Sequence, residues 1–310
     1  MPLYQTIDGL PVPLFYDPKI VRTAMEYLPG DDDIIVSSFP KCGASFVSQI
    51  VQLILKNGQQ CYSTDEFFSS VPILELMGTE TVHNLPSPRC LKTYLPLDRI
   101  EYKKHSKYIY VARHFSECVV SYYRHIRMFP VYLFTDGTID EFVSLFIKGE
   151  VCYGDYISHF SSGYSKRWYD NVLFITYELL TLNLKDAILQ IAGFLGEKHV
   201  RNLKRCGEKV LKDILFLNSS FMKSTVDDFW REMFLEKLLA GKCDLHFPVA
   251  DKYARMVKEA ESKGHFLNDV PDDITLSEEN IEKLEKYFKD RVWIEGSAIW
   301  NYFMKIDINC

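Results

Sequence analysis

A lysine and a glycine in the segment Phe39-Pro40-Lys41-Cys42-Gly43-Ala44-Ser45 have the residue types and spacing of an anion-binding loop. Unpaired backbone N–H groups at a helix N-terminus attract anions, and Lys41 adds a mobile positive charge beside them. Gly43 has no side chain, so the backbone there can approach a ligand closely. The spacing differs from G-x-x-x-x-G-K-[ST], which excludes an ordinary Walker A loop. The segment predicts a phosphate site of another kind, and an ordinary strand-to-helix connection with a surface lysine remains the alternative.

Arg113, Ser121 and Tyr177 are further candidate binding residues. An arginine guanidinium can bind phosphate through two parallel hydrogen bonds, and a serine hydroxyl can donate a third. Arg113 ends one apolar strand pattern and Tyr177 follows another. Ligands of parallel sheets bind at the carboxyl ends of the strands, so these residues are expected near Lys41. A surface charge, a helix-face hydroxyl and a buried structural phenol are the respective alternatives.

Three units of strand and helix must position these residues. Apolar runs at 34–36, 107–113 and 172–176 predict strands, and a short strand is expected at 90–93. Alternation of strands with helices predicts an α/β fold, with a central parallel β-sheet flanked by helices. A helix is expected after each of the three strands. The first has an apolar pattern from Val47 to Leu55 and ends at Gly58, and the second is capped by Ser116. The third follows a turn at Tyr177-Glu178, runs from Lys185 to Leu195 and ends at Gly196.

The domain organisation expected from the sequence is a single domain over residues 1–310. Its core is expected at about 30–224, and residues 225–310 form a helical insertion and C-terminal region. No Pro/Gly/Ser-rich linker divides the chain. The candidate helices in the later part of the sequence are Lys209 to Leu217, Asp227 to Leu239, Asp251 to Lys263 and Ser277 to Lys289.

The composition of the chain limits the kinds of binding partner and the cellular compartment that we expect for the protein. A net charge of −6 and a pI near 5.8 argue against nucleic acid as the main partner. Residues 1–14 do not resemble a signal peptide, and no run of eighteen apolar residues predicts a membrane span. The eight cysteines are scattered without a C-x-x-C pair, which favours a cytoplasmic protein with reduced thiols and no metal site. Lys41 and the helix N-terminus are expected to lower the pKa of the Cys42 thiol, although a small residue that fits the turn is the favoured interpretation.

Four blocks, in this order, resemble the cytosolic sulfotransferase family, which transfers a sulfuryl group from 3′-phosphoadenosine 5′-phosphosulfate (PAPS). The resemblance covers roughly residues 1–224 and implies the P-loop-like fold of that family. The blocks are Phe39 to Phe46, similar to the 5′-phosphosulfate loop Tyr-Pro-Lys-Ser-Gly-Thr-Thr-Trp; Tyr110 to Arg113 with Val120 to Tyr123, similar to the 3′-phosphate motif; Tyr177-Glu178 with Ile191 to Gly196, similar to Tyr-Glu and Ile-Ala-x-Phe-Leu-Gly; and Ser219 to Lys223, similar to the segment that closes over the adenine.

The resemblance implies roles for individual residues. Lys41 would stabilise the leaving oxygen, Lys92 would face the transferring group, and Tyr94 occupies the position of the catalytic base. Phe46 stands where the family has an adenine-stacking tryptophan, and core packing is its alternative. The residues expected to bind PAPS or its product PAP, without a metal, are Lys41, Cys42, Gly43, Ala44, Ser45, Phe46, Arg113, Ser121, Tyr177, Ser219, Phe221 and Arg291.

Two departures from the family pattern bear on activity. The family has histidine where this chain has Tyr94, and a free phenol is far less ionised than an imidazole at neutral pH. Three alternatives follow: Tyr94 is a base with a lowered pKa, the acceptor is acidic enough to need no base, or the protein binds nucleotide without turnover. Another imidazole, such as that of His83, is a further candidate for the base. The late Arg-Lys-Gly block has no clean copy, and the residues from Arg291 to Phe303 are favoured over those from Glu236 to Phe247 as its counterpart.

The expected function is transfer of a sulfuryl group from PAPS to a hydroxyl or amine of a small molecule, with a phenol favoured. A PAPS- or PAP-binding pseudoenzyme with a regulatory role is the alternative, and a small-molecule kinase is disfavoured by the missing Walker A spacing. The oligomeric state is left open. Aromatic residues that could line the acceptor site, with core packing as the alternative for each, are Phe15, Tyr16, Phe67, Phe68, Tyr153 and Tyr156.

Overall fold

The computed structural model describes residues 2–61, 63–223, 250–265, 270 and 273–292. The predicted helix Asp227 to Leu239, the predicted counterpart block at Glu236 to Phe247 and the residues after Val292 lie outside these ranges. Statements below about structure concern the described residues.

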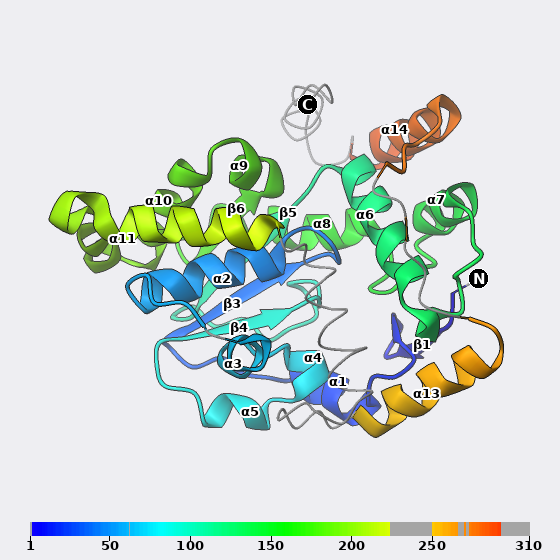
Figure 1. Ribbon diagram of the computed structural model, residues 1–310, viewed down its shortest axis with the longest axis horizontal. Coiled ribbons are helices and arrows are strands. Elements are labelled where there is room, and N and C mark those ends of the chain that lie inside the picture. The colour runs from blue at the N-terminus through cyan, green and yellow to red at the C-terminus, as the bar shows by residue number, and fades with distance from the viewer. Residues whose placement is uncertain (1, 62, 224–249, 266–269, 271–272, 293–310) are drawn as a thin grey trace.

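A four-stranded parallel sheet lies at the centre of the molecule (Figure 1). Its strands, in spatial order, are β4 (Arg89–Thr93), β3 (Asp33–Ser38), β5 (Lys107–Ala112) and β6 (Val172–Thr176). Ser37 is in register with Thr93 on one side and with Tyr110 on the other, and Ala112 is in register with Thr176. The α/β prediction is confirmed, and all four strands end at the same edge.

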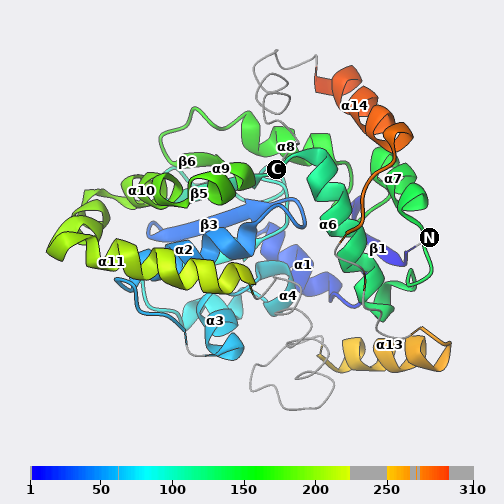
Figure 2. The same ribbon diagram turned by 45° about the horizontal axis from the view of Figure 1, so that its top comes forward.

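Helices cover both faces of the sheet. On one face, α2 (Ala44–Leu55), α10 (Leu184–Leu195) and α11 (Glu197–Lys223) pack on alternate strand residues such as Val36 and Val111. Figure 2 shows α2 and α11 side by side over the strands. The other alternating set, including Ile35 and Tyr110, belongs to a second core cluster with residues of α1 (Pro18–Met25), α4 (Leu74–Met77) and α8 (Tyr156–Tyr164). Strands buried on both faces explain their nearly continuous apolar sequences.

A further group of elements lies at the carboxyl edge of the sheet, at the right in Figure 1. It contains α6 (Phe115–Met128), the short 3₁₀ turn η1 (Pro130–Tyr132), α7 (Ile139–Lys148), α13 (Ala250–Ser262) and α14 (Glu278–Val292). An antiparallel hairpin of β1 (Tyr4–Ile7) and β2 (Leu10–Pro13) completes it. The short helices α3 (Thr64–Ser70), α5 (Glu80–His83) and α9 (Tyr177–Leu182) lie elsewhere around the sheet.

Two local predictions are wrong. Ser116 lies inside α6 and does not cap it, because the N-cap residue is His114, whose backbone N–H donates to Glu178 Oε1 at 2.6 Å. Tyr177-Glu178 is the first turn of α9 and not a turn before a helix, because the Thr176 hydroxyl accepts from the Leu179 N–H and caps it. The predicted helix Lys209 to Leu217 is part of the longer α11.

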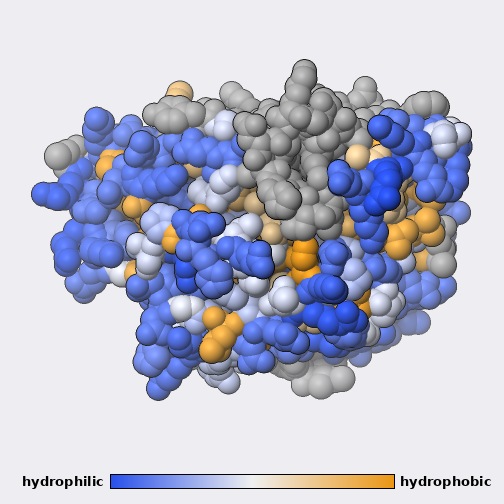
Figure 3. Space-filling model, turned by 90° about the horizontal axis from the view of Figure 1, so that it is seen from below, coloured by the Kyte–Doolittle hydropathy of each residue, from blue (hydrophilic) through white to orange (hydrophobic). Residues whose placement is uncertain are grey.

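The surface in Figure 3 is largely hydrophilic, with apolar side chains in small separate groups. Within the described residues, none of the helices combines the length and the apolar character needed to cross a membrane. The division of the chain into a core and a C-terminal elaboration stays a prediction.

Candidate active site

The segment between β3 and α2 forms a tight loop at the carboxyl edge of the sheet. Lys41 has a φ of 68°, and Gly43, the N-cap residue of α2, has a φ of 105°. A Cβ atom on Gly43 would lie 2.7 Å from Cδ2 of Tyr177, so the ring of Tyr177 needs glycine there. The loop leaves the N-terminus of a twelve-residue helix beside a lysine, which suits a phosphate group.

Arg113 lies directly against this loop. Its Nη1 donates to the Lys41 carbonyl at 3.2 Å, its Nη2 lies 3.3 Å from Glu117, and its guanidinium lies 4.4 Å from the centre of the Tyr177 ring. Its Nε is buried and finds no hydrogen-bond partner among the described residues. The predicted neighbours Lys41, Arg113 and Tyr177 are therefore brought together, and an anion could accept from the Nε–H. Ser121 is half-buried on α6.

Cys42 differs from the expectation for a reactive thiol. It is buried, and burial raises the pKa of its thiol instead of lowering it. Its Sγ lies 3.6 Å from Sγ of Cys118 on α6. The desolvation of a thiolate therefore outweighs the nearby positive charges, and Cys42 acts as a small packing residue.

The first residues of α2 are buried as well. Phe46 is only 2% exposed and belongs to the core cluster under α2, with its ring 6.5 Å from that of Tyr177 in an edge-on arrangement. Ala44 and Ser45 are also buried. The Ser45 hydroxyl accepts a hydrogen bond of 2.9 Å from Lys92 Nζ, which ties this helix to β4.

Lys92 is a fully buried lysine within the sheet. Its Nζ lies 5.6 Å from the centre of the Phe68 ring and 5.4 Å from that of Tyr94. Burial, with a smaller contribution from Lys41, lowers the pKa of Lys92 to about 7, while Glu75 and Cys90 oppose the shift. The ammonium charge is therefore partly lost at neutral pH.

Lys41 also lines an aromatic pocket. The pocket is assembled from the hairpin, the anion loop, the end of β4, the C-terminal half of α6 with η1, the segment before α8, and α13. Its lining residues are Pro13, Phe15, Tyr16, Pro40, Lys41, Tyr94, Tyr122, His125, Phe129, Val131, Tyr132, Cys152, Tyr153 and Tyr253.

A sequence model of the sulfotransferase domain matches residues 31–263. The chain belongs to the sulfotransferase family. Sulfotransferase 1 family member D1 of Mus musculus is 33% identical over 247 residues, which are 76% of this chain and 81% of that protein. Sulfotransferase 1B1 of Canis lupus familiaris is 32% identical over 71% of this chain and 79% of that protein.

Solved structures agree with the fold. Mouse sulfotransferase SULT7A1 complexed with PAP superposes with a TM-score of 0.68 at 19% identity, covering 97% of this chain and 99% of that chain. Retinol dehydratase in a complex with retinol and PAP gives a TM-score of 0.52 at 20% identity, covering 84% and 86%. The P-loop-like sulfotransferase fold implied by the sequence is confirmed.

Tyr94 lies in the pocket wall, directly after β4. Its ring lies 5.7 Å from that of Tyr153, and its backbone N–H donates to Glu75 at 2.6 Å. His83, considered as a substitute imidazole, is exposed at the end of α5 and is absent from the pocket lining. The imidazole that does line the pocket is that of His125 on α6.

The later predicted residues lie in helices of this sulfotransferase. Arg291 lies near the end of α14, where its Nη1 is 2.5 Å from Asp155. The Phe288 ring stacks on Phe115 with 4.8 Å between centres, which brings α14 to the start of α6. Ser219 and Phe221 lie in the last turns of α11, and their side chains are outside the described part of the structure. Roles for these residues at the nucleotide stay predictions.

The aromatic pocket contains some of the aromatic residues that the sequence suggested for an acceptor site and not others. Phe15, Tyr16 and Tyr153 line it, whereas Phe67, Phe68 and Tyr156 are buried outside its lining. The hairpin that presents the first two was not predicted, although Asp8-Gly9 between apolar residues is a hairpin signal. Glu75 was missed as well, and its signal is a lone carboxylate inside an apolar run.

Proposed function

We propose that this protein transfers the sulfuryl group of PAPS to a hydroxyl or amine of a small molecule, with a phenol as the favoured acceptor. The observation that carries the proposal is the position of Lys41 between two sites. On one side are the N-terminus of α2, Gly43 and Arg113, which suit the phosphates of the nucleotide. On the other side is the aromatic pocket, which suits the acceptor.

The arrangement supplies what sulfuryl transfer needs. The transferring group and the leaving oxygen gain negative charge, and positive groups held in a dry site stabilise them. Lys41 lies at the junction of the two sites, and Lys92 is buried one strand away with its Nζ on Ser45 of α2. Fixed donors and a fixed pocket also hold the two substrates in line, which removes an entropic barrier.

A phenol fits the chemistry of the pocket. Most of its lining is aromatic or aliphatic, including Phe15, Phe129 and Val131. Aromatic rings pack favourably edge-on or offset against one another, as Phe15 and Tyr253 do with ring centres 4.8 Å apart. Lys41 and Tyr94 both line the pocket, and the reacting hydroxyl is expected beside them.

The first test is binding of PAP, measured by titration calorimetry. We expect the native chain to bind, and Arg113→Ala to weaken binding by about 10²-fold, because about two charge-assisted hydrogen bonds are lost. Arg201→Ala is the matched control, since Arg201 is an exposed arginine paired with Glu197 on α11. A native chain without affinity for PAP would remove the proposal.

The second test is transfer of labelled sulfate from PAPS to phenols, catecholamines and aliphatic alcohols. The native chain and Tyr94→His are compared at equal concentration. Turnover by the native chain supports the enzyme. Turnover by Tyr94→His alone, with PAP bound by both, identifies the native protein as a nucleotide-binding pseudoenzyme.

A further inference from the structure

A buried carboxylate lies behind the wall of the acceptor pocket. Glu75 on α4 is fully buried, and three groups donate to it: the Tyr94 N–H at 2.6 Å, the Thr93 hydroxyl at 2.8 Å and the Tyr153 hydroxyl at 3.2 Å. The segment before α4 holds it there, because Lys92 N–H donates to the Pro72 carbonyl at 2.9 Å. Glu75 thus acts as an acceptor toward all three groups, which is the arrangement of an ionised carboxylate.

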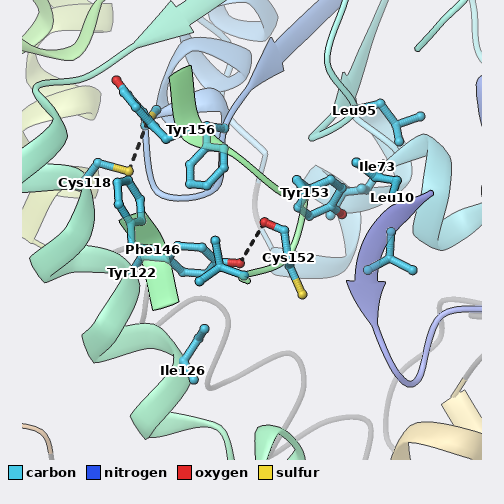
Figure 4. Close-up of a cluster of buried hydrophobic side chains, with 14 of the residues drawn as sticks. Leu10, Ile73, Leu95, Cys118, Tyr122, Ile126, Phe146, Cys152, Tyr153 and Tyr156 are labelled. Atoms are coloured by element: carbon cyan, nitrogen blue, oxygen red, sulfur yellow. Dashed lines mark hydrogen bonds between the residues drawn. The ribbon is translucent and has the colours of Figure 1, made fainter. Parts of the chain in front are cut away.

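Two of these donors belong to residues of the pocket lining: Tyr94 donates through its backbone N–H and Tyr153 through its side-chain hydroxyl. The phenol ring of Tyr153 lies among Leu10, Ile73 and Leu95 (Figure 4), and its hydroxyl reaches Glu75 Oε1. Its backbone has a φ of 67°, a left-handed conformation that is unfavourable for a bulky residue. The Tyr153 N–H donates to the Pro11 carbonyl at 2.7 Å, which fixes that conformation. The fold therefore holds this phenol between the pocket and Glu75 at an energetic cost.

The surrounding charges suit proton acceptance by Glu75. Burial raises the pKa of Glu75, so its carboxylate is more basic than an exposed one. Burial also raises the pKa values of Tyr153 and Tyr16, which keeps both phenols protonated. The charged or titratable groups that face Glu75 are these two tyrosines, Tyr94 and Lys92, and the Lys92 ammonium is the counter-charge.

We propose that Tyr153 and Glu75 form a proton relay that takes the proton of the acceptor in place of the missing imidazole. The inference rests on the proposed sulfotransferase function. The acceptor oxygen bonds to sulfur while the bond from sulfur to the leaving phosphate oxygen breaks, and PAP departs with that electron pair. The acceptor proton passes to the Tyr153 oxygen as the Tyr153 proton passes to Glu75 Oε1. The proton returns to solvent through Tyr153 after the products leave.

The relay differs in kind from a base at Tyr94. Glu75 accepts from the hydroxyl of Tyr153 and from the backbone N–H of Tyr94, so the relay runs through the Tyr153 side chain. His125 is the competing imidazole of the pocket, located on α6 and stacked on Phe129 with ring centres 4.7 Å apart. These two groups are the alternatives that the experiment must separate from the relay.

The test measures kcat for acceptors that range from acidic phenols to an aliphatic alcohol, after PAP affinity has been measured for each variant. General-base catalysis is worth about 10²- to 10⁴-fold and matters most for weakly acidic acceptors. We expect Tyr153→Phe to lower kcat by about 10²-fold for the alcohol and only slightly for the most acidic phenol. Tyr123→Phe controls for loss of a buried tyrosine hydroxyl, because it removes a hydrogen bond to the Gly137 carbonyl outside the pocket.

A second background separates proton transfer from packing. Tyr94→His restores an imidazole at the position where the family has one, so the relay becomes redundant. In that background Tyr153→Phe should have little effect on the acidity dependence. Glu75→Gln should reproduce Tyr153→Phe where it folds, and Tyr153→Phe decides the question where it does not.

Three results would overturn the relay. The first is that Tyr153→Phe lowers kcat equally for all acceptors in both backgrounds. The second is that the dependence of kcat on acceptor acidity changes in His125→Gln or Tyr94→Phe and not in Tyr153→Phe. The third is that the native chain binds PAP but only Tyr94→His turns over. Absence of PAP binding by the native chain instead removes the proposed function itself, and the binding measurement shows this before turnover is measured.

Discussion

The proposed nucleotide side and the proposed acceptor side of the site are built differently. On the nucleotide side, Lys41, Gly43, Arg113 and Tyr177 follow the ends of three neighbouring strands, and Arg113 contacts both the loop and the Tyr177 ring. On the acceptor side, the pocket draws on elements from β2 to α13, and the buried Glu75 accepts from two of its residues, Tyr94 and Tyr153.

The difference shows which part of the site is free to change. A phosphate site made of backbone N–H groups, a glycine and two cations depends on local geometry that few substitutions preserve. The acceptor side is a surface of side chains, and proton transfer there can be reassigned among neighbouring groups. Tyr94, which the resemblance aligns with the histidine of the family, lines the pocket on this second side.

The largest effect is expected for Lys41→Met. This change keeps the length of the side chain and removes the charge at the junction of the two sites, so kcat should fall by about 10²- to 10³-fold. Steady-state kinetics with saturating PAPS measure it. An unchanged kcat would show that the nucleotide side does not take part in the chemical step.

The next effect concerns Lys92 and pH. Because burial lowers the pKa of Lys92 to about 7, its charge is present below pH 7 and is lost as the pH rises through 7. If that charge stabilises the transferring group, kcat of the native chain falls as the pH rises through 7. Lys92→Met should have a lower kcat that does not fall over this pH range. If kcat of Lys92→Met still falls as the pH rises through 7, the titrating group is not Lys92.

Gly43→Ala is expected to have a moderate effect on both stability and nucleotide binding. The φ of 105° and the 2.7 Å approach of Tyr177 make any Cβ unfavourable, at a cost of about 1–3 kcal/mol. Thermal unfolding with and without PAP measures it. Gly193→Ala in α10 is the matched control, since a Cβ there meets no atom within 4 Å, and it should stabilise the protein by up to about 1 kcal/mol.

The smallest effect is expected for Arg291→Ala. The arginine is half exposed and paired with Asp155, so solvent screening limits the loss of stability to at most about 1 kcal/mol. Chemical denaturation measures it. A loss of PAP affinity of tenfold or more would instead place Arg291 on the nucleotide side of the comparison.

The proximity of Lys41, Arg113 and Tyr177 could be predicted from the sequence because each of them follows a strand. Once Ile34 to Val36 and the strand before Arg113 are recognised, parallel pairing places Lys41 and Arg113 at one edge. Two details escaped this reasoning. The thiol of Cys42 is buried, and the start of α6 is held by Glu178 from another strand end.

The sequence by itself determined the parallel sheet and the position of the anion loop, because strand periodicity and a glycine at a helix start are local properties. Only the tertiary structure decided that Tyr153 contacts Glu75 and that Lys92 is desolvated by burial. It also decided that His125 and not His83 lines the pocket. These facts depend on which distant segments meet and on how much solvent remains between them. Burial and long-range contact set the pKa values and the proton path, and neither is encoded in residue spacing alone.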